Sequence, residues 1–239
     1  MSAETVSGVV VGLRAVSLDF AGVPVLVELS LRAGAGDVIC LRGNNGSGKT
    51  SLLRILANVA RPTSGKRVGV ASCAYVPATF DPVPMRVGEW LTLLPRHNRG
   101  NVSAMLDELG FDSDPAKKLA DLSFGNLRKL MLAEAMTSGE TLLVIDEVTA
   151  GLDARGIEAT CTQLQILAAA GCAIVSADQH DRPVPHGAKL FDLVEGSLRK
   201  RPMPSPGDDD VIAVEVRVKR SRLRALDNWL RSQGETSAP

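Results

Sequence analysis

A glycine-rich loop of eight residues places the strongest constraint on how this chain can fold. It has the sequence Gly-Asn-Asn-Gly-Ser-Gly-Lys-Thr over residues 43–50 and matches the spacing G-x-x-x-x-G-K-[ST] without a mismatch. The apolar run at 37–41 before the loop is typical of a buried strand, and the run at 51–56 after it is typical of a helix. Strand, loop and helix in this order are the context in which this spacing binds phosphate.

The residue types of the loop suit a nucleotide with its metal ion. Glycines let successive backbone N–H groups turn toward an anion, and the helix N-terminus adds partial positive charge. We expect Lys49 to meet the β- and γ-phosphates as a catalytic charge, and the Thr50 hydroxyl to hold Mg²⁺. A flexible surface turn would explain the glycines but not the Lys-Thr pair with both flanks. The predicted nucleotide-binding residues of this segment are Gly43, Asn44, Asn45, Gly46, Ser47, Gly48, Lys49, Thr50 and Ser51.

Two carboxylates follow a second apolar run, at 141–145. Acidic pairs are common at strand ends, so this pair gains meaning only beside a phosphate loop. In that context we expect Asp146 to bind Mg²⁺ and Glu147 to orient and deprotonate a water for attack on phosphorus.

A third segment, Leu122-Ser123-Phe124-Gly125-Asn126, precedes a run with helical spacing. Ser-x-Gly before a helix is a routine cap, and it is also a common anion site. Its place between the other two motifs makes the segment informative.

Alternating strand and helix patterns predict an α/β fold, a P-loop NTPase core with a mostly parallel sheet. Residues 9–36 predict a small antiparallel β layer, and residues from about 85 to 136 predict a helical insert. The ATP-binding domain is expected over 1–201, with a Pro- and Asp-rich linker at 202–210. Residues 211–239 predict a short appended strand–helix element.

Composition narrows the function classes. Lys plus Arg and Asp plus Glu balance at 27 each in 239 residues, so no net charge calls for nucleic acid as a partner. The four cysteines are scattered without metal-ligand spacing, which favours a reducing compartment. No secretion signal is visible, and no apolar run approaches the roughly 20 residues that span a bilayer. Any membrane role is therefore expected to be peripheral.

The order of these motifs resembles the ATP-binding cassette (ABC) family of transporter ATPases over roughly residues 10–200. The segment at 122–126 resembles the family signature leucine-serine-glycine-glycine-glutamine, and Phe20 falls near where the family stacks an aromatic ring on adenine. Phe191 to Gly196 resemble the last core strand and its turn. The other matching segments are Gly43 to Thr50, Asp146 with Glu147, and Thr149 to Asp153.

The resemblance implies a head-to-tail dimer, either a homodimer or a heterodimer with a second ABC subunit. Ser123 and Gly125 would then contact the ATP bound to the phosphate loop of the other subunit. It also implies integral membrane permease subunits docked on the helical insert. The expected location is cytoplasmic, peripheral on the inner face of the cell membrane.

Several positions depart from the family pattern. Ala78 stands where the family has a glutamine that contacts Mg²⁺ and the attacking water. The family's switch histidine corresponds to Asp178 or, if the turn is longer, to His180, and the count from Gly171 favours Asp178. An ionised carboxylate there would repel the γ-phosphate, which predicts slow hydrolysis rather than none.

Two rival functions stay open at this point. The departures favour a nucleotide-binding regulatory or assembly subunit in which ATP turns over little. A soluble ABC ATPase that acts outside transport is the other rival, although a single cassette with zero net charge argues against one that acts on nucleic acid.

Overall fold

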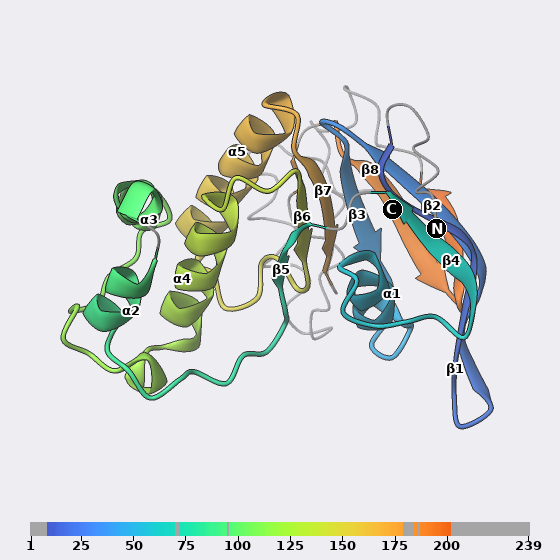
Figure 1. The fold of residues 1–239 in the computed structure, drawn as a ribbon, viewed down its shortest axis with the longest axis horizontal. Coiled ribbons are helices and arrows are strands. Elements are labelled where there is room, and N and C mark those ends of the chain that lie inside the picture. The colour runs from blue at the N-terminus through green and yellow to red at the C-terminus, as the bar shows by residue number, and fades with distance from the viewer. Residues whose placement is uncertain (1–8, 70–71, 95, 179–183, 186, 202–239) are drawn as a thin grey trace, which may run out of the picture. The chain divides into compact units, whose positions relative to one another are not determined.

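A six-stranded sheet carries the phosphate loop at the end of a central strand (Figure 1). All of its neighbouring pairs are parallel except the last, in which β9 runs antiparallel to β8. The mostly parallel sheet of the predicted α/β fold is therefore confirmed. In spatial order the strands are β5 (Ala74–Val76), β6 (Leu142–Ile145), β7 (Ala173–Ala177), β3 (Val38–Arg42), β8 (Lys189–Val194) and β9 (Ser197–Arg201).

This computed structural model describes residues 9–69, 72–94, 96–178, 184–185 and 187–201. Three predictions fall outside these residues: a switch role for His180, the linker at 202–210, and the strand–helix element at 211–239.

The antiparallel β layer predicted at 9–36 is confirmed and has a third strand. Strand β1 (Val9–Phe20) pairs with β2 (Val23–Gly34) on one side and with β4 (Ser64–Gly69) on the other. The reversal between β1 and β2 falls at 21–22, where both residues have positive φ. Gly65 of β4 has φ +78°, and a Cβ there would lie 2.2 Å from the Ala15 carbonyl oxygen, so this strand requires a glycine.

Helices cover the sheet because its central strands are apolar on both faces. In β3, Ile39 and Leu41 pack into one core cluster, whereas Val38 and Cys40 pack into another. The first cluster includes the antiparallel layer and α1 (Lys49–Leu56). The second includes α2 (Val87–Leu93), α3 (Arg96–Glu108), α4 (Phe124–Met136) and α5 (Ala154–Ala169).

The segment predicted as a helical insert contains α2, α3, a short 3-10 turn at Leu119–Asp121, and α4. Helix α4 contacts α3, and it also contacts β5 and α5 (Figure 1). It therefore connects the outer helices α2 and α3 to the edge of the sheet.

Candidate nucleotide site

The phosphate loop joins β3 to α1 in a conformation that only glycine adopts easily. Gly46 and Gly48 have φ of +78° and +100°. A Cβ on Gly43, whose φ is +151°, would lie 2.7 Å from both the Leu193 carbonyl oxygen and the Ser47 hydroxyl. The predicted glycine spacing therefore corresponds to backbone that has no room or no allowed φ for a side chain.

Lys49 begins α1 and lies across the loop. Its Nζ donates to the carbonyl oxygens of Gly43 at 2.6 Å and Asn44 at 3.0 Å. Burial lowers the pKa of Lys49, while the carboxylates of Asp146 and Glu147 act in the opposite direction. The ammonium group is thus held inside the loop, where an anion would meet it.

Thr50 and Asp146 meet although they are far apart in sequence. The Thr50 hydroxyl donates to Oδ2 of Asp146 at 2.7 Å. Asp146 follows β6 and is 1% exposed, and burial raises its pKa while the Thr50 hydrogen bond opposes the rise. A hydroxyl and a carboxylate oxygen at this spacing fit the oxygen ligands that Mg²⁺ prefers. These two residues would hold the ion.

One pocket of about 380 Å³ collects most of the predicted site. Phe20, at the end of β1, is 61% exposed and lies at this pocket with Val25. The other residues that line this pocket are Asn45, Gly46, Ser47, Gly48, Lys49, Thr50, Ser51, Asp146 and Glu147. Neither Ser123 nor Gly125 belongs to the lining, so the chain by itself does not bring the signature-like segment to this pocket.

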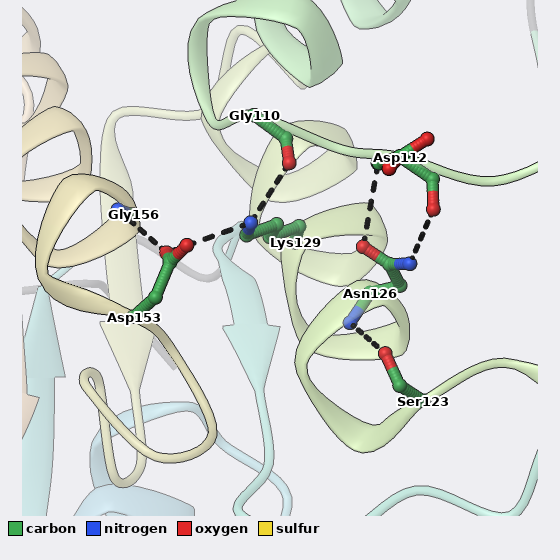
Figure 2. A network of polar contacts seen from close by, with 7 residues as sticks. All are labelled: Gly110, Asp112, Ser123, Asn126, Lys129, Asp153 and Gly156. Carbon is green, nitrogen blue, oxygen red and sulfur yellow. Dashed lines mark hydrogen bonds and ion pairs between the residues drawn. The ribbon is translucent and has the colours of Figure 1, made fainter.

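Ser123 caps α4, and its side chain accepts a hydrogen bond from the Asn126 N–H at 3.2 Å (Figure 2). The Asn126 side chain donates to the Asp112 carbonyl oxygen at 2.7 Å. A Cβ on Gly125 would lie 2.5 Å from the Gly151 carbonyl oxygen, so the start of α4 touches the loop that follows Glu147. Phe124, between the cap and this contact, is 50% exposed.

Arg128 is a residue that the sequence did not single out. It is 2% exposed and donates to the carbonyl oxygens of Pro77 at 2.6 Å, Glu147 at 2.8 Å and Asp146. Burial lowers the pKa of Arg128 to about 10. Nothing in its sequence context distinguishes it from an exposed helical arginine.

The Asp178 side chain does not have the orientation that was expected from the sequence. Its Oδ2 accepts hydrogen bonds from the N–H of Thr149, at 3.2 Å, and from the Thr149 hydroxyl. Asp178 is not among the residues that line the nucleotide pocket. The carboxylate that was expected to face the γ-phosphate is instead bonded to the loop after Glu147.

Comparison with known proteins gives concordant results. The family model described as "ABC transporter" matches residues 26–150. The zinc import ATP-binding protein ZnuC of Roseobacter denitrificans is 33% identical over 171 residues, covering 69% of this chain and 67% of that protein. The zinc import ATP-binding protein ZnuC 2 of Hahella chejuensis is 29% identical over 171 residues, covering 69% of this chain and 70% of that protein.

Solved structures share the fold. An ATP-binding subunit of an ABC transporter superposes with a TM-score of 0.71 at 20% identity, covering 96% of this chain and 95% of that one. A dimeric bacterial ABC transporter cassette, MJ0796, superposes with a TM-score of 0.72 at 19% identity, covering 80% of this chain and 97% of that one. Among the described residues, no helix is both long and apolar enough to cross a membrane.

Proposed function

This chain belongs to the ABC transporter family and is an ATP-binding subunit of a transporter; from that premise we propose that it hydrolyses ATP to drive a separate membrane permease. The observation that carries this proposal is the convergence of Lys49, Thr50, Asp146 and Glu147 on one pocket. A phosphate cradle, two metal-binding oxygens and a carboxylate base are the groups that phosphoryl transfer to water requires.

Each group has a distinct role in this proposal. The loop N–H groups and Lys49 bind the β- and γ-phosphates, and Phe20 lies at the pocket rim where a base would stack. Thr50 and Asp146 would hold Mg²⁺, which neutralises charge on the phosphate oxygens. Glu147 takes the proton of the attacking water, because it lines the same pocket and has a carboxylate to accept that proton.

Slow basal turnover is the expectation for the chain alone. Ala78 follows Pro77 beside the Arg128 guanidinium, and its methyl group has no polar atom for a metal ion or a water. A missing contact to the attacking water can lower the rate about 10²–10³-fold. This observation favours the second candidate, a regulatory subunit that binds ATP with little turnover.

A second subunit would complete the site. Ser123 and Gly125 are absent from the pocket lining, yet they lie at the N-terminus of α4, where backbone N–H groups favour an anion. We propose that this end of α4 contacts the ATP of a partner cassette, in a homodimer or a heterodimer. Closure of the two subunits then depends on bound ATP.

A groove beside the edge strand β5 offers a place for the permease. About 470 Å³ in volume, it is lined by Trp90 of α2, Met131 of α4 and Tyr75 of β5, with 41%-exposed Phe80 at its margin. A partly apolar groove of this kind suits an amphipathic helix. Docking there would place the chain peripherally on the cytoplasmic face of the membrane, and the permease would determine the cargo.

The first experiment tests the nucleotide site itself. Replacing Lys49 with Ala removes the charge inside the phosphate loop, so calorimetry should show MgATP affinity falling about tenfold or more. Lys117→Ala changes an exposed lysine away from the pocket and should bind as the wild type does. Equal affinity of Lys49→Ala and wild type would overturn the site. Turnover measured with and without the permease then separates the ATPase from the regulatory subunit.

A further inference from the structure

Glu147 has a backbone conformation that most residues avoid. Its φ of +53° lies in the left-handed region, although it is not a glycine. A non-glycine residue keeps such a conformation only where the surrounding structure fixes it. The contacts on either side of Glu147 therefore determine where its carboxylate lies in the nucleotide pocket.

Arg128 fixes the segment from one side. Its guanidinium donates to the carbonyl oxygens of both Asp146 and Glu147, and also to that of Pro77 beyond β5. Because Arg128 is 2% exposed, water does not compete for these hydrogen bonds.

Asp178 fixes the segment from the other side. Its Oδ2 accepts from both the N–H and the hydroxyl of Thr149, and the Val148 N–H donates to the Ala177 carbonyl oxygen at 3.1 Å. Thr149 is 3% exposed and Asp178 is 7% exposed. Arg42 lines the same small cavity as Asp178 and brings a compensating positive charge to it.

We propose that Asp178 is a positioning residue for hydrolysis: through Thr149 it holds the loop that carries Glu147, opposite the Arg128 guanidinium. This proposal rests on the proposed function, in which Glu147 is the catalytic base. Releasing Thr149 lets Glu147 leave its left-handed conformation, so its carboxylate no longer reaches the attacking water. The phosphate loop is untouched, so nucleotide binding should persist while the chemical step slows.

A pair of substitutions at Thr149 isolates this hydrogen bond. Thr149→Val keeps the shape and removes the hydroxyl, whereas Thr149→Ser keeps the hydroxyl. We expect kcat of Thr149→Val to fall about 10²-fold with KM within about twofold, because a displaced catalytic group costs rate rather than binding. Thr149→Ser should stay within about threefold of wild type.

Thr160→Val is the matched control. Thr160 is 1% exposed and lines the same cavity, and its hydroxyl has no hydrogen-bond partner among the described residues. The same loss of a buried hydroxyl should therefore leave turnover unchanged. If Thr160→Val slows turnover as much as Thr149→Val, packing rather than positioning explains the effect and the proposal fails.

Amide hydrogen exchange over residues 146–150 gives a readout that needs no turnover. We expect exchange about tenfold faster in Thr149→Val and unchanged in Thr149→Ser and Thr160→Val. If wild type binds ATP but does not hydrolyse it, the proposed ATPase function fails, and the exchange rates still decide whether Asp178 holds the loop. Wild-type protection in Thr149→Val would overturn the proposal.

Discussion

Asp146, the Mg²⁺ ligand that we propose, carries its charge at the expense of stability. It is 1% exposed, and burial raises its pKa in the folded chain above the ordinary value of 3.8. Since the folded state holds the proton more tightly than the unfolded chain, ionisation destabilises the fold. The destabilisation is absent below pH 3.8, grows through the raised pKa and is complete above it.

Asp146→Asn should therefore stabilise the nucleotide-free protein while removing the proposed Mg²⁺ ligand. The amide oxygen can still accept the hydrogen bond of Thr50. We expect the melting temperature at pH 7 to rise, because the variant no longer buries a charge whose ionisation destabilises the fold. The difference in melting temperature between Asp146→Asn and wild type should disappear as the pH approaches 3.8. MgATP should stabilise the variant less than wild type. A variant that melts below wild type at pH 7 would contradict this account.

Ala78→Gln should raise basal turnover. The new amide would lie next to Pro77, which the Arg128 guanidinium already fixes at 2.6 Å, and would offer an oxygen to Mg²⁺ and a hydrogen bond to water. We expect kcat to rise about tenfold or more with KM little changed. Thr79→Gln, at the neighbouring exposed position, should not change kcat in the same steady-state assay if the gain depends on position. Equal kcat for Ala78→Gln and wild type would show that this position does not limit hydrolysis.

The sequence predicts the position of a site residue well when the spacing of its motif has only one physical explanation. Residues 45–50 of the phosphate loop line one pocket together with Asp146 and Glu147, whereas Gly43 and Asn44 are not among its lining residues. Arg128 was missed because its role depends on carbonyl oxygens from two distant segments. Asp178 was assigned an orientation from a resemblance, whereas its carboxylate accepts hydrogen bonds from Thr149.

At the scale of elements, apolar strands were predictable and polar edge strands were not. β3 and β6 are buried apolar runs, and both were expected from the sequence alone. β4 has the sequence Ser-Gly-Lys-Arg-Val-Gly and β9 has Ser-Leu-Arg-Lys-Arg, and neither shows an alternating apolar pattern. Both lie at the edge of their sheets, where charged residues oppose pairing with other chains.

Lys129 of α4 contacts the end of α3 and the start of α5, which are separate helices in the sequence. Its Nζ donates to the Gly110 carbonyl oxygen, just after α3, at 2.8 Å and lies 3.7 Å from Oδ1 of Asp153 (Figure 2). Asp153 in turn accepts from the Gly156 N–H at 2.9 Å and caps α5. A single side chain thus joins α4 to the end of α3 and the start of α5.

Lys129→Met should loosen this junction without touching the nucleotide pocket. The methionine covers similar apolar surface but leaves the Gly110 carbonyl oxygen without its donor, at a cost of about 1–2 kcal/mol. Denaturant unfolding should show that loss, and the MgATP dissociation constant should stay within about twofold. Lys117→Met, at an exposed position, serves as the control and should unfold as wild type does. Equal stability of both variants would show that the junction contributes nothing.

At the scale of the whole molecule, the two parts that we propose as halves of an ATP site do not meet within one chain. The pocket holds the phosphate loop and Glu147, whereas Ser123 and Gly125 lie at the start of α4, outside its lining. A head-to-tail pair of chains brings one half-site of each chain to the other, whereas a side-by-side pair with like surfaces in contact does not. The two arrangements differ in what a mixture of defective chains can do.

Mixing two variants tests the head-to-tail arrangement directly. Glu147→Gln removes the base but keeps ATP binding, and Ser123→Asp keeps a good N-cap for α4 while directing a negative charge at the partner's phosphate. Each variant alone should be nearly inactive. In an equal mixture about half of the dimers are mixed and each has one intact site, so activity should reach about a quarter of the wild-type value. Mixing Glu147→Gln with Lys49→Ala places both defects in the same half-site and should restore nothing. If the first mixture is also inactive, the chain either completes its site within one subunit or pairs with a different cassette, and the homodimeric arrangement is wrong.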